Sequence, residues 1–257
     1  MKFTVQENKP LTATVYRMTL RGDTRALLRP GQFVQLQLPG FYLRRPFSVY
    51  DWSPAERGCM TLVYKTVGRG TEAMTRIPVG ATLDALVGLG NGFITDDIPA
   101  AAAARAPLLI GGGVGVPPLY GLCRRLLLQG QRPAAVLGFN TREEVILRAD
   151  FEALGIPVTV ATVDGSEGVK GFVADAVETL AAPLDYVYTC GPEPMLRAVH
   201  ALCGRKGVGG QFSFEERMGC GFGACMGCTC ETVTGGKRIC KEGPVLVWEE
   251  ILWQTRG

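Results

Sequence analysis

The chain has 257 residues, of which 47% are hydrophobic and 20% charged, a composition typical of a globular protein with more than one core. A formal net charge of +3 is too small and too dispersed to indicate nucleic-acid binding. The N-terminal sequence has no apolar signal core, and no apolar run reaches the length of a membrane helix, so we expect no membrane association. Nine cysteines crowded mainly into one segment argue against a disulfide scaffold and predict reduced, metal-holding thiols in a cytoplasmic protein.

Residues 1–98 are predicted to form a first domain, a small antiparallel β-barrel. Short alternating segments at 12–20, 33–38, 60–66 and 82–87 are separated by glycine and proline, and no long helix interrupts them. Strands of this length with frequent turns are typical of a closed barrel.

One extended segment of this barrel carries a candidate ligand motif, RRPFSV at 44–49. Arg45 can pair with a diphosphate through two parallel hydrogen bonds, and Ser48 can reach a flavin ring or ribityl chain. Taken alone, this pattern is more typical of an edge-strand arginine beside a proline. Three further motifs follow, however: VYK at 63–65, GRGT at 68–71 opening a helix whose free N–H groups favour phosphate, and GLGNGF at 88–93.

Together these four motifs resemble the FAD domain of the ferredoxin-reductase family. In that family the arginine and the Gly-Thr pair hold the diphosphate, while the serine and the strand residues line the flavin. Phe47 stands where tyrosine is commoner, which removes a hydroxyl. The resemblance therefore implies FAD contacts for Arg45, Pro46, Phe47, Ser48, Val63, Tyr64, Lys65, Gly70 and Thr71.

Residues 99–210 are predicted to form a parallel-sheet α/β domain. An alanine-rich linker at 99–107 precedes a strand, a glycine loop and a helix that runs to about Gln129. Strands at 134–139, 158–163 and 186–190 follow, with helical stretches near Phe151 and Val173. Strands that alternate with helices indicate a parallel sheet with ligands at the carboxyl ends of its strands.

The glycine loop, GGGVG at 111–115, is not a strict dinucleotide fingerprint and by itself is equally typical of a tight turn. In the ferredoxin-reductase family, GGGxGxxP and CGPxPM frame the nicotinamide nucleotide, which here implies contacts from Gly111, Gly112, Gly113, Gly115, Cys190 and Gly191. Cys190 is expected to be a packing group rather than a nucleophile. Arg142 favours NADP and the neighbouring Glu143–Glu144 pair favours NAD, so the choice of nucleotide stays open at this point.

Residues 211–257 are predicted to form a small 2Fe–2S domain. Cys220, Cys225, Cys228 and Cys240 have the C-x4-C-x2-C-x11-C spacing of plant-type ferredoxins, and the interleaved glycines suit a tightly curled loop. Zinc is the alternative, because Cys225-x2-Cys228 is a common half-site, but a second knuckle is missing. Cys230 remains as a spare thiol or an alternative ligand.

The order of flavin barrel, nucleotide domain and cluster segment resembles the electron-transfer subunits of NAD-linked (type 1B) dihydroorotate dehydrogenase. The motifs that carry this resemblance are RRPFSV, GLGNGF, the ExxMxCGxGxCxxC run that begins at Glu215, and RICKEGPV ending at Val245. This resemblance implies FAD, a 2Fe–2S cluster and NAD as cofactors. It also implies a partner subunit that carries FMN and oxidises dihydroorotate, in a heterotetramer with two copies of each subunit. Alternatives are the small flavin subunit of another oxidoreductase, such as a sulfide dehydrogenase or a ferredoxin–NADP transhydrogenase, and a zinc-stabilised adaptor.

Overall fold

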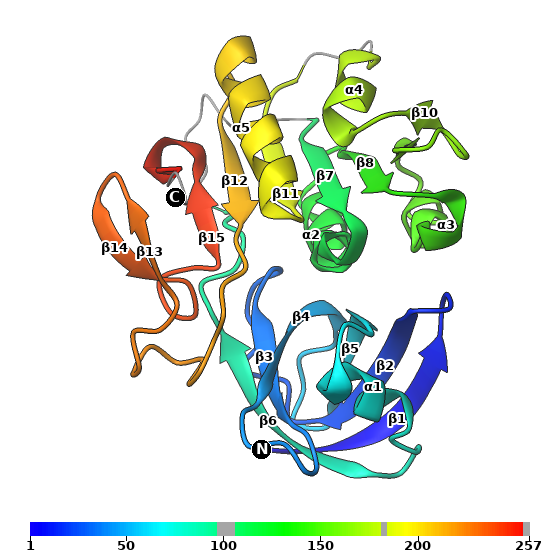
Figure 1. Ribbon diagram of the computed structural model, residues 1–257, viewed down its shortest axis with the longest axis vertical. Coiled ribbons are helices and arrows are strands. Elements are labelled where there is room, and N and C mark those ends of the chain that lie inside the picture. Colours follow the sequence, from blue (N-terminus) through cyan, green and yellow to red (C-terminus); the bar gives the residue numbers. More distant parts are fainter. Residues whose placement is uncertain (97–105, 181–183, 254–257) are drawn as a thin grey trace.

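The computed structural model describes residues 1–96, 106–180 and 184–253, so most of the predicted linker at 99–107 lies outside the described residues. A barrel, a mostly parallel sheet flanked by helices, and a small β-hairpin segment follow one another along the chain (Figure 1). The predicted fold class is therefore confirmed.

The N-terminal part is a closed antiparallel barrel of six strands in the order β1-β2-β5-β4-β3-β6. Its elements are β1 (Lys2–Pro10), β2 (Val15–Gly22), β3 (Phe33–Gln37), β4 (Arg45–Trp52), β5 (Gly58–Lys65), α1 (Arg69–Thr75) and β6 (Thr82–Leu89). The strand predicted at 12–20 begins at Val15, because the Thr12 hydroxyl accepts hydrogen bonds from the N–H groups of Thr14 and Val15 and holds a turn there.

Strand β3 shows how the barrel separates its two faces. Successive side chains of a strand point to opposite sides. Val34 and Leu36 are buried in the barrel core, whereas Phe33 packs outside it, with Cys228 and Ile239 of the C-terminal segment. Strand β3 therefore serves both the barrel interior and the surface that the C-terminal segment covers.

The second part is a seven-stranded sheet in the order β10-β9-β8-β7-β11-β12-β15, in which only the edge pair β12–β15 is antiparallel among the described strands. Its strands are β7 (Leu108–Gly112), β8 (Ala134–Phe139), β9 (Val158–Thr162), β10 (Val169–Lys170), β11 (Val187–Cys190), β12 (Gly210–Ser213) and β15 (Val245–Val247). The helices are α2 (Pro117–Leu128), α3 (Arg148–Glu152), α4 (Val173–Glu178) and α5 (Glu193–Lys206).

Helices cover both faces of this sheet (Figure 1). Leu119 of α2 and Phe151 of α3 share one core with Leu109, while Val177 of α4 and Val199 of α5 share another with its neighbour in sequence, Ile110. Apolar side chains thus face both ways along β7, as expected for a strand buried on both sides. None of the described helices is long and apolar enough to cross a lipid bilayer.

The C-terminal segment contributes to two structures. Strands β13 (Thr229–Thr232) and β14 (Gly235–Arg238) form a hairpin beside the sheet (Figure 1). Strand β15 returns to pair with β12, and Trp248 beyond it stacks on His200 of α5 with ring centroids 4.9 Å apart. The predicted domain limit between residues 210 and 211 falls inside β12, so that division stays a prediction.

Polar contacts join the barrel to the other two parts. Asp150 of α3 accepts hydrogen bonds of 2.8 Å from both Arg17 of β2 and Tyr50 of β4. The Asn91 side chain, just after β6, donates to the carbonyls of Glu242 and Val245 at 3.0 and 2.7 Å. These contacts fix the barrel against both the sheet and the C-terminal segment.

Candidate functional site

A cavity of about 1010 Å³ is lined by residues from all three parts of the chain. Ligand-binding clefts typically measure ~300–1,000 Å³, so this one has room for a large ligand. It is lined by thirteen of the fifteen residues expected to bind FAD or NAD: Arg45, Pro46, Phe47, Ser48, Val63, Tyr64, Lys65, Thr71, Gly112, Gly113, Gly115, Cys190 and Gly191.

The two exceptions, Gly70 and Gly111, support neighbouring residues. A Cβ at Gly70 would lie 3.1 Å from Nε of Arg45, so glycine leaves room for the guanidinium. A Cβ at Gly111 would lie 2.8 Å from Cγ2 of Val116, where β7 meets the start of α2. Gly111 is therefore required by strand–helix packing rather than placed on the cavity wall.

Arg45 begins strand β4 and is held at the cavity edge. Its Nη1 donates to the carbonyl oxygen of Leu43 at 2.7 Å, and the guanidinium lies 5.3 Å from the centroid of the Phe41 ring. The Thr71 hydroxyl nearby accepts from the N–H groups of Val67 and Gly68 at 2.9 and 3.2 Å, closing the turn before α1. A fixed cation next to this turn fits a diphosphate.

The VYK segment of β5 alternates between the barrel interior and the cavity. Tyr64 is buried in the barrel core, where its hydroxyl donates to Oδ1 of Asn8 at 2.9 Å. Lys65 points the other way and pairs with Glu144 at 3.2 Å. Most of the Tyr64 ring therefore packs in the core although this residue also lines the cavity, and the outward residues Val63 and Lys65 line it as well.

The glycine loop, with its 3-10 turn Gly113–Gly115, lies directly on the loop after β11. A Cβ at Gly115 would lie 2.3 Å from the Cys190 carbonyl oxygen and 2.6 Å from Cα of Gly191. Only a residue without a side chain permits this approach. Gly112 similarly faces Met195 of α5, whose Sδ would lie 2.6 Å from an added Cβ.

Cys190 ends β11 at the centre of this contact. Burial raises the pKa of its thiol to about 12, although a hydrogen bond with Ser213 opposes the shift. The thiol is therefore protonated at neutral pH, when a nucleophilic cysteine needs its thiolate. This agrees with the expectation that Cys190 is a packing group.

The polar edge of the cavity follows β8. Glu144 lines the cavity and accepts a hydrogen bond of 2.8 Å from the Asn140 side chain. Burial raises the pKa of Glu144, but Lys65 and Asn140 outweigh it and hold the pKa below its usual value. Arg142 is directed to the neighbouring loop, where it donates to the carbonyl oxygen of Ser166 at 2.7 Å. At the end of β8, the carboxylate of Glu144 thus lines the cavity, whereas Arg142 is not among the lining residues.

The four predicted cluster cysteines form an outer and an inner pair. The side chains of Cys220 and Cys225 contact each other in the loop, and those of Cys228 and Cys240 contact each other beneath it. The inner pair is buried with Phe33, whereas Cys225 is exposed. Within the described ranges, no three His, Cys, Asp or Glu side chains already converge as a ligand set for a metal ion.

Backbone N–H groups are directed at the sulfur atoms. Those of Ala224 and Cys225 lie 3.2 and 3.4 Å from Sγ of Cys220, and that of Cys240 lies 3.4 Å from Sγ of Cys228. Burial raises the pKa of the Cys220 thiol, but the N–H groups of Cys225, Phe222 and Ala224 and the Cys225 side chain outweigh it and lower the pKa to about 6. Four thiols and donors that favour negatively charged sulfur fit a 2Fe–2S cluster.

Glycine shapes this loop at two of the expected positions. Gly221 and Gly223 have φ values of +80° and +91°, a region that side chains disfavour. The other two glycines, Gly219 and Gly227, leave space near Sγ of Cys225 instead, at 3.4 and 3.6 Å from an added Cβ. Cys230 lies outside the loop, in strand β13.

The sequence motifs did not identify the residues that connect the cavity to the cysteine loop. Ser213, Phe214, Glu215 and Met218 line the cavity between β12 and the loop, and Phe33 and Pro244 complete that wall. Glu215 and Met218 belong to the run beginning at Glu215 that carries the resemblance to the dihydroorotate dehydrogenase subunits. That run was the sequence signal that could have identified them as site residues. The position of Phe33 follows only from the packing of β3.

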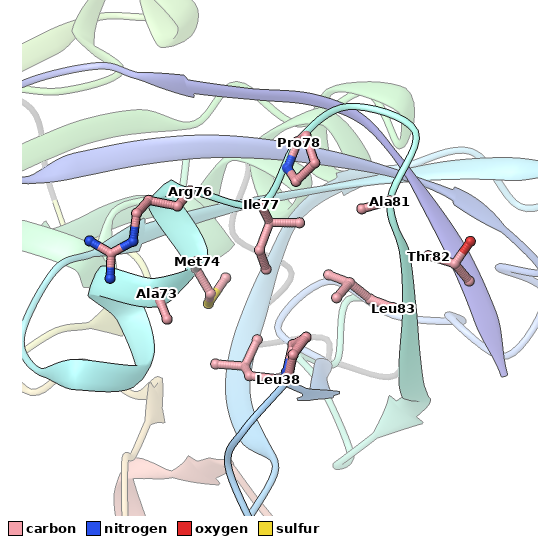
Figure 2. Close-up of a pocket in the computed structure, with 10 residues that line it drawn as sticks. Leu38, Ala73, Met74, Arg76, Ile77, Pro78, Ala81, Thr82 and Leu83 are labelled. Atoms are coloured by element: carbon pink, nitrogen blue, oxygen red, sulfur yellow. The ribbon is translucent and has the colours of Figure 1, made fainter.

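A smaller pocket of about 240 Å³ lies on the barrel between α1 and β6 (Figure 2). Met74, Ile77 and Leu83 give it apolar walls, and Arg76 extends away from them. None of the predicted site residues lines this pocket, so it contributes nothing to the site described above.

Comparisons with known proteins show which family the chain belongs to. Residues 215–252 match the iron-sulfur cluster binding domain of dihydroorotate dehydrogenase B, and residues 109–201 match the oxidoreductase NAD-binding domain. The electron transfer subunit of dihydroorotate dehydrogenase B (NAD(+)) from Geobacillus sp. (strain WCH70) is 41% identical, with 98% of each chain covered. The chain belongs to this family. The dihydroorotate dehydrogenase B electron transfer subunit of Bacillus caldolyticus is 38% identical, again over 98% of each chain.

Solved structures of other oxidoreductases share the fold of this chain. A structure of an NADH-dependent reduced ferredoxin–NADP oxidoreductase, described in the context of flavin-based electron bifurcation, matches with a TM-score of 0.87 and 29% identity. The match covers 98% of this chain and 90% of that one. Phthalate dioxygenase reductase matches with a TM-score of 0.62 and 18% identity, over 79% of this chain and 64% of that one, which shows the shared fold alone.

Proposed function

We propose that this chain is the electron-transfer subunit of an NAD-linked dihydroorotate dehydrogenase in pyrimidine biosynthesis. It accepts electrons from a catalytic partner subunit and delivers them to NAD⁺. The observation that carries the proposal is the single cavity lined by the flavin-like strand, the glycine loop and the segment leading to the four cysteines. Membership of the family over nearly the whole chain supports the same function.

In this proposal each part of the site holds one cofactor. Arg45, Gly70 and Thr71 hold the diphosphate of FAD, while residues 46–48 and 63–65 line its ring system. Residues 112–115 of the glycine loop and the Cys190–Gly191 pair hold NAD, and Gly111 supports the loop by packing against α2. Cys220, Cys225, Cys228 and Cys240 hold the 2Fe–2S cluster. The corresponding divisions are residues 1–98, 99–210 and 211–257.

A bound flavin supplies the conversion between the one-electron chemistry of an iron–sulfur cluster and the two-electron chemistry of a nicotinamide. The protein's own contribution is positional. The short contact between Gly115 and Cys190 fixes the floor of the nucleotide site, and the protonated Cys190 thiol adds packing without competing chemistry. Donors around Cys220 favour negatively charged sulfur.

The partner in this proposal is an FMN-containing subunit that oxidises dihydroorotate, in an assembly with two copies of each subunit. The name of the relatives, electron transfer subunit, supports a separate catalytic subunit. We also propose a cytoplasmic location, supported by nine cysteines that are all free thiols.

Replacing one cluster ligand tests the proposal. Cys225→Ala should abolish the cluster's visible absorbance and the partner-dependent formation of NADH, while FAD-dependent reduction of a dye by NADH persists. Cys59→Ala is the matched control, because Cys59 lies in β5 of the barrel and outside the cluster loop. Loss of both activities in Cys225→Ala, or of neither, would contradict the assignment. A colourless protein after anaerobic reconstitution with iron, sulfide and FAD would instead indicate a zinc adaptor.

A second candidate is the small flavin subunit of another NAD(P)H oxidoreductase. It is favoured by the 0.87 TM-score to the ferredoxin–NADP oxidoreductase chain. Purification of the native complex separates the two candidates. A partner that oxidises dihydroorotate supports the first, and a partner with a different substrate supports the second.

A further inference from the structure

Gln35 of β3 is buried in an unusual way. Its side chain is fully buried, and neither Nε2 nor Oε1 has a hydrogen-bond partner within the described parts of the chain. Buried amides in proteins are nearly always paired, because an unpaired polar group loses its bonds to water without replacement.

Other buried glutamines of the chain show the ordinary arrangement. Gln32 accepts hydrogen bonds from the N–H groups of Leu28 and Arg29 and donates to the Gly90 carbonyl at 3.0 Å. Gln211 binds both the N–H and the carbonyl of Ile94 at 2.8 Å. The unpaired amide of Gln35 is therefore specific to its position.

Gln35 lies between strand β4, which carries the flavin-like motif, and the cysteine loop. In the sheet, Gln35 pairs with Pro46 of β4, within the proposed FAD motif. Its side chain points away from the barrel core that holds Val34 and Leu36, and the amide lies against Gly221. A Cβ at Gly221 would lie 2.3 Å from Nε2 and 2.9 Å from Oε1. Gly221 directly follows Cys220, so the amide contacts the loop that carries the proposed cluster ligands.

We propose that the side-chain amide of Gln35 donates a hydrogen bond to a sulfur atom of the iron–sulfur cluster and raises the cluster's reduction potential. The inference rests on the proposed function, because it requires the cluster to be present. Hydrogen bonds to the sulfurs are among the factors that set such potentials, since they stabilise the more negative, reduced form. Gln35 thus favours electron flow onto the cluster.

Gln35→Met removes the amide while keeping the length of the side chain. In the reconstituted full-length chain, an EPR-monitored redox titration should show a lower cluster potential. We expect the equilibrium between cluster and FAD to move about tenfold toward reduced FAD, which corresponds to ~59 mV for a one-electron couple. Gln37→Leu is the matched control on the same face of the strand, because the Gln37 amide donates to the carbonyls of Phe41 and Leu38 in the turn that follows β3. Its potential should equal that of the unmodified chain.

A second measurement needs no variant. With ¹⁵N in the glutamine side chains, pulsed EPR of the reduced cluster in the unmodified chain should detect a coupled ¹⁵N nucleus. An unchanged potential in Gln35→Met, an equal change in Gln37→Leu, or the absence of ¹⁵N coupling would overturn the inference. If Gln35→Met does not assemble, the ¹⁵N result alone decides. Failure of the unmodified chain to assemble any cluster would contradict the proposed function itself.

Discussion

Replacing Gly115 by alanine gives the most direct test of the nucleotide site. An added Cβ would lie 2.3 Å from the Cys190 carbonyl oxygen, 2.5 Å from its carbonyl carbon and 2.6 Å from Cα of Gly191. All three atoms belong to the backbone, so no side-chain rotation relieves the overlap. The glycine loop and the loop after β11 must separate.

The size of the effect follows from these distances. The closest contact is about 1 Å shorter than an ordinary van der Waals contact, and a displacement of ~1 Å within a site can cost ~100-fold in rate. Overpacking of this kind also destabilises a protein by ~1–3 kcal/mol. We therefore expect kcat/KM for NADH-dependent dye reduction to fall by about 100-fold, whereas the FAD and cluster absorbance stays unchanged.

The assay is steady-state dye reduction with varied NADH, together with the visible spectrum of the same samples. Gly204→Ala is the control, because an added Cβ in α5 meets only Cζ2 of Trp248, at an ordinary 3.4 Å. Alanine in a helix stabilises by ~0.5–1 kcal/mol relative to glycine, so this variant should be fully active. A Gly115→Ala protein with unchanged kinetics for NADH would refute the assignment of this loop to the nucleotide.

Three further outcomes are expected. Arg45→Ala should weaken FAD binding by ~10- to 100-fold, because a charge-assisted hydrogen bond contributes ~1.5–3 kcal/mol. Titration of the flavin-free chain with FAD measures this affinity, and an unchanged value would show that Arg45 does not bind FAD. Glu144→Gln should raise the NADPH-to-NADH ratio of kcat/KM by about tenfold, since it removes a carboxylate that repels a 2′-phosphate. An unchanged ratio would show that other residues select between NADH and NADPH. Burial lowers the pKa of His200 from 6.5, so the unfolded chain binds more protons and stability falls as the pH drops below that value. Denaturant unfolding should show a flatter pH dependence in His200→Gln, and an identical slope would contradict this reasoning.

The sequence by itself determined the features that depend on local pattern. Alternating short strands indicated the barrel, strands alternating with helices indicated the parallel sheet, and the strand predicted at 134–139 matches β8 at both ends. Cysteine spacing suggested four cluster ligands, because a loop that surrounds a cluster needs its thiols at short, fixed separations. Glycine at positions 221 and 223 was likewise readable, since a tightly curled loop requires backbone conformations that side chains disfavour.

Only the tertiary structure decided which side of each strand meets which part of the chain. Strand periodicity shows that Gln35 and Leu36 face opposite ways, but the cysteine loop that covers Gln35 comes from residues nearly two hundred positions later. The same limit applies to Gly111 and Gly115, which look alike in the motif although one packs on α2 and the other on the Cys190 loop. Long-range contacts of this kind depend on how separate elements pack together, and the local sequence pattern does not predict that packing.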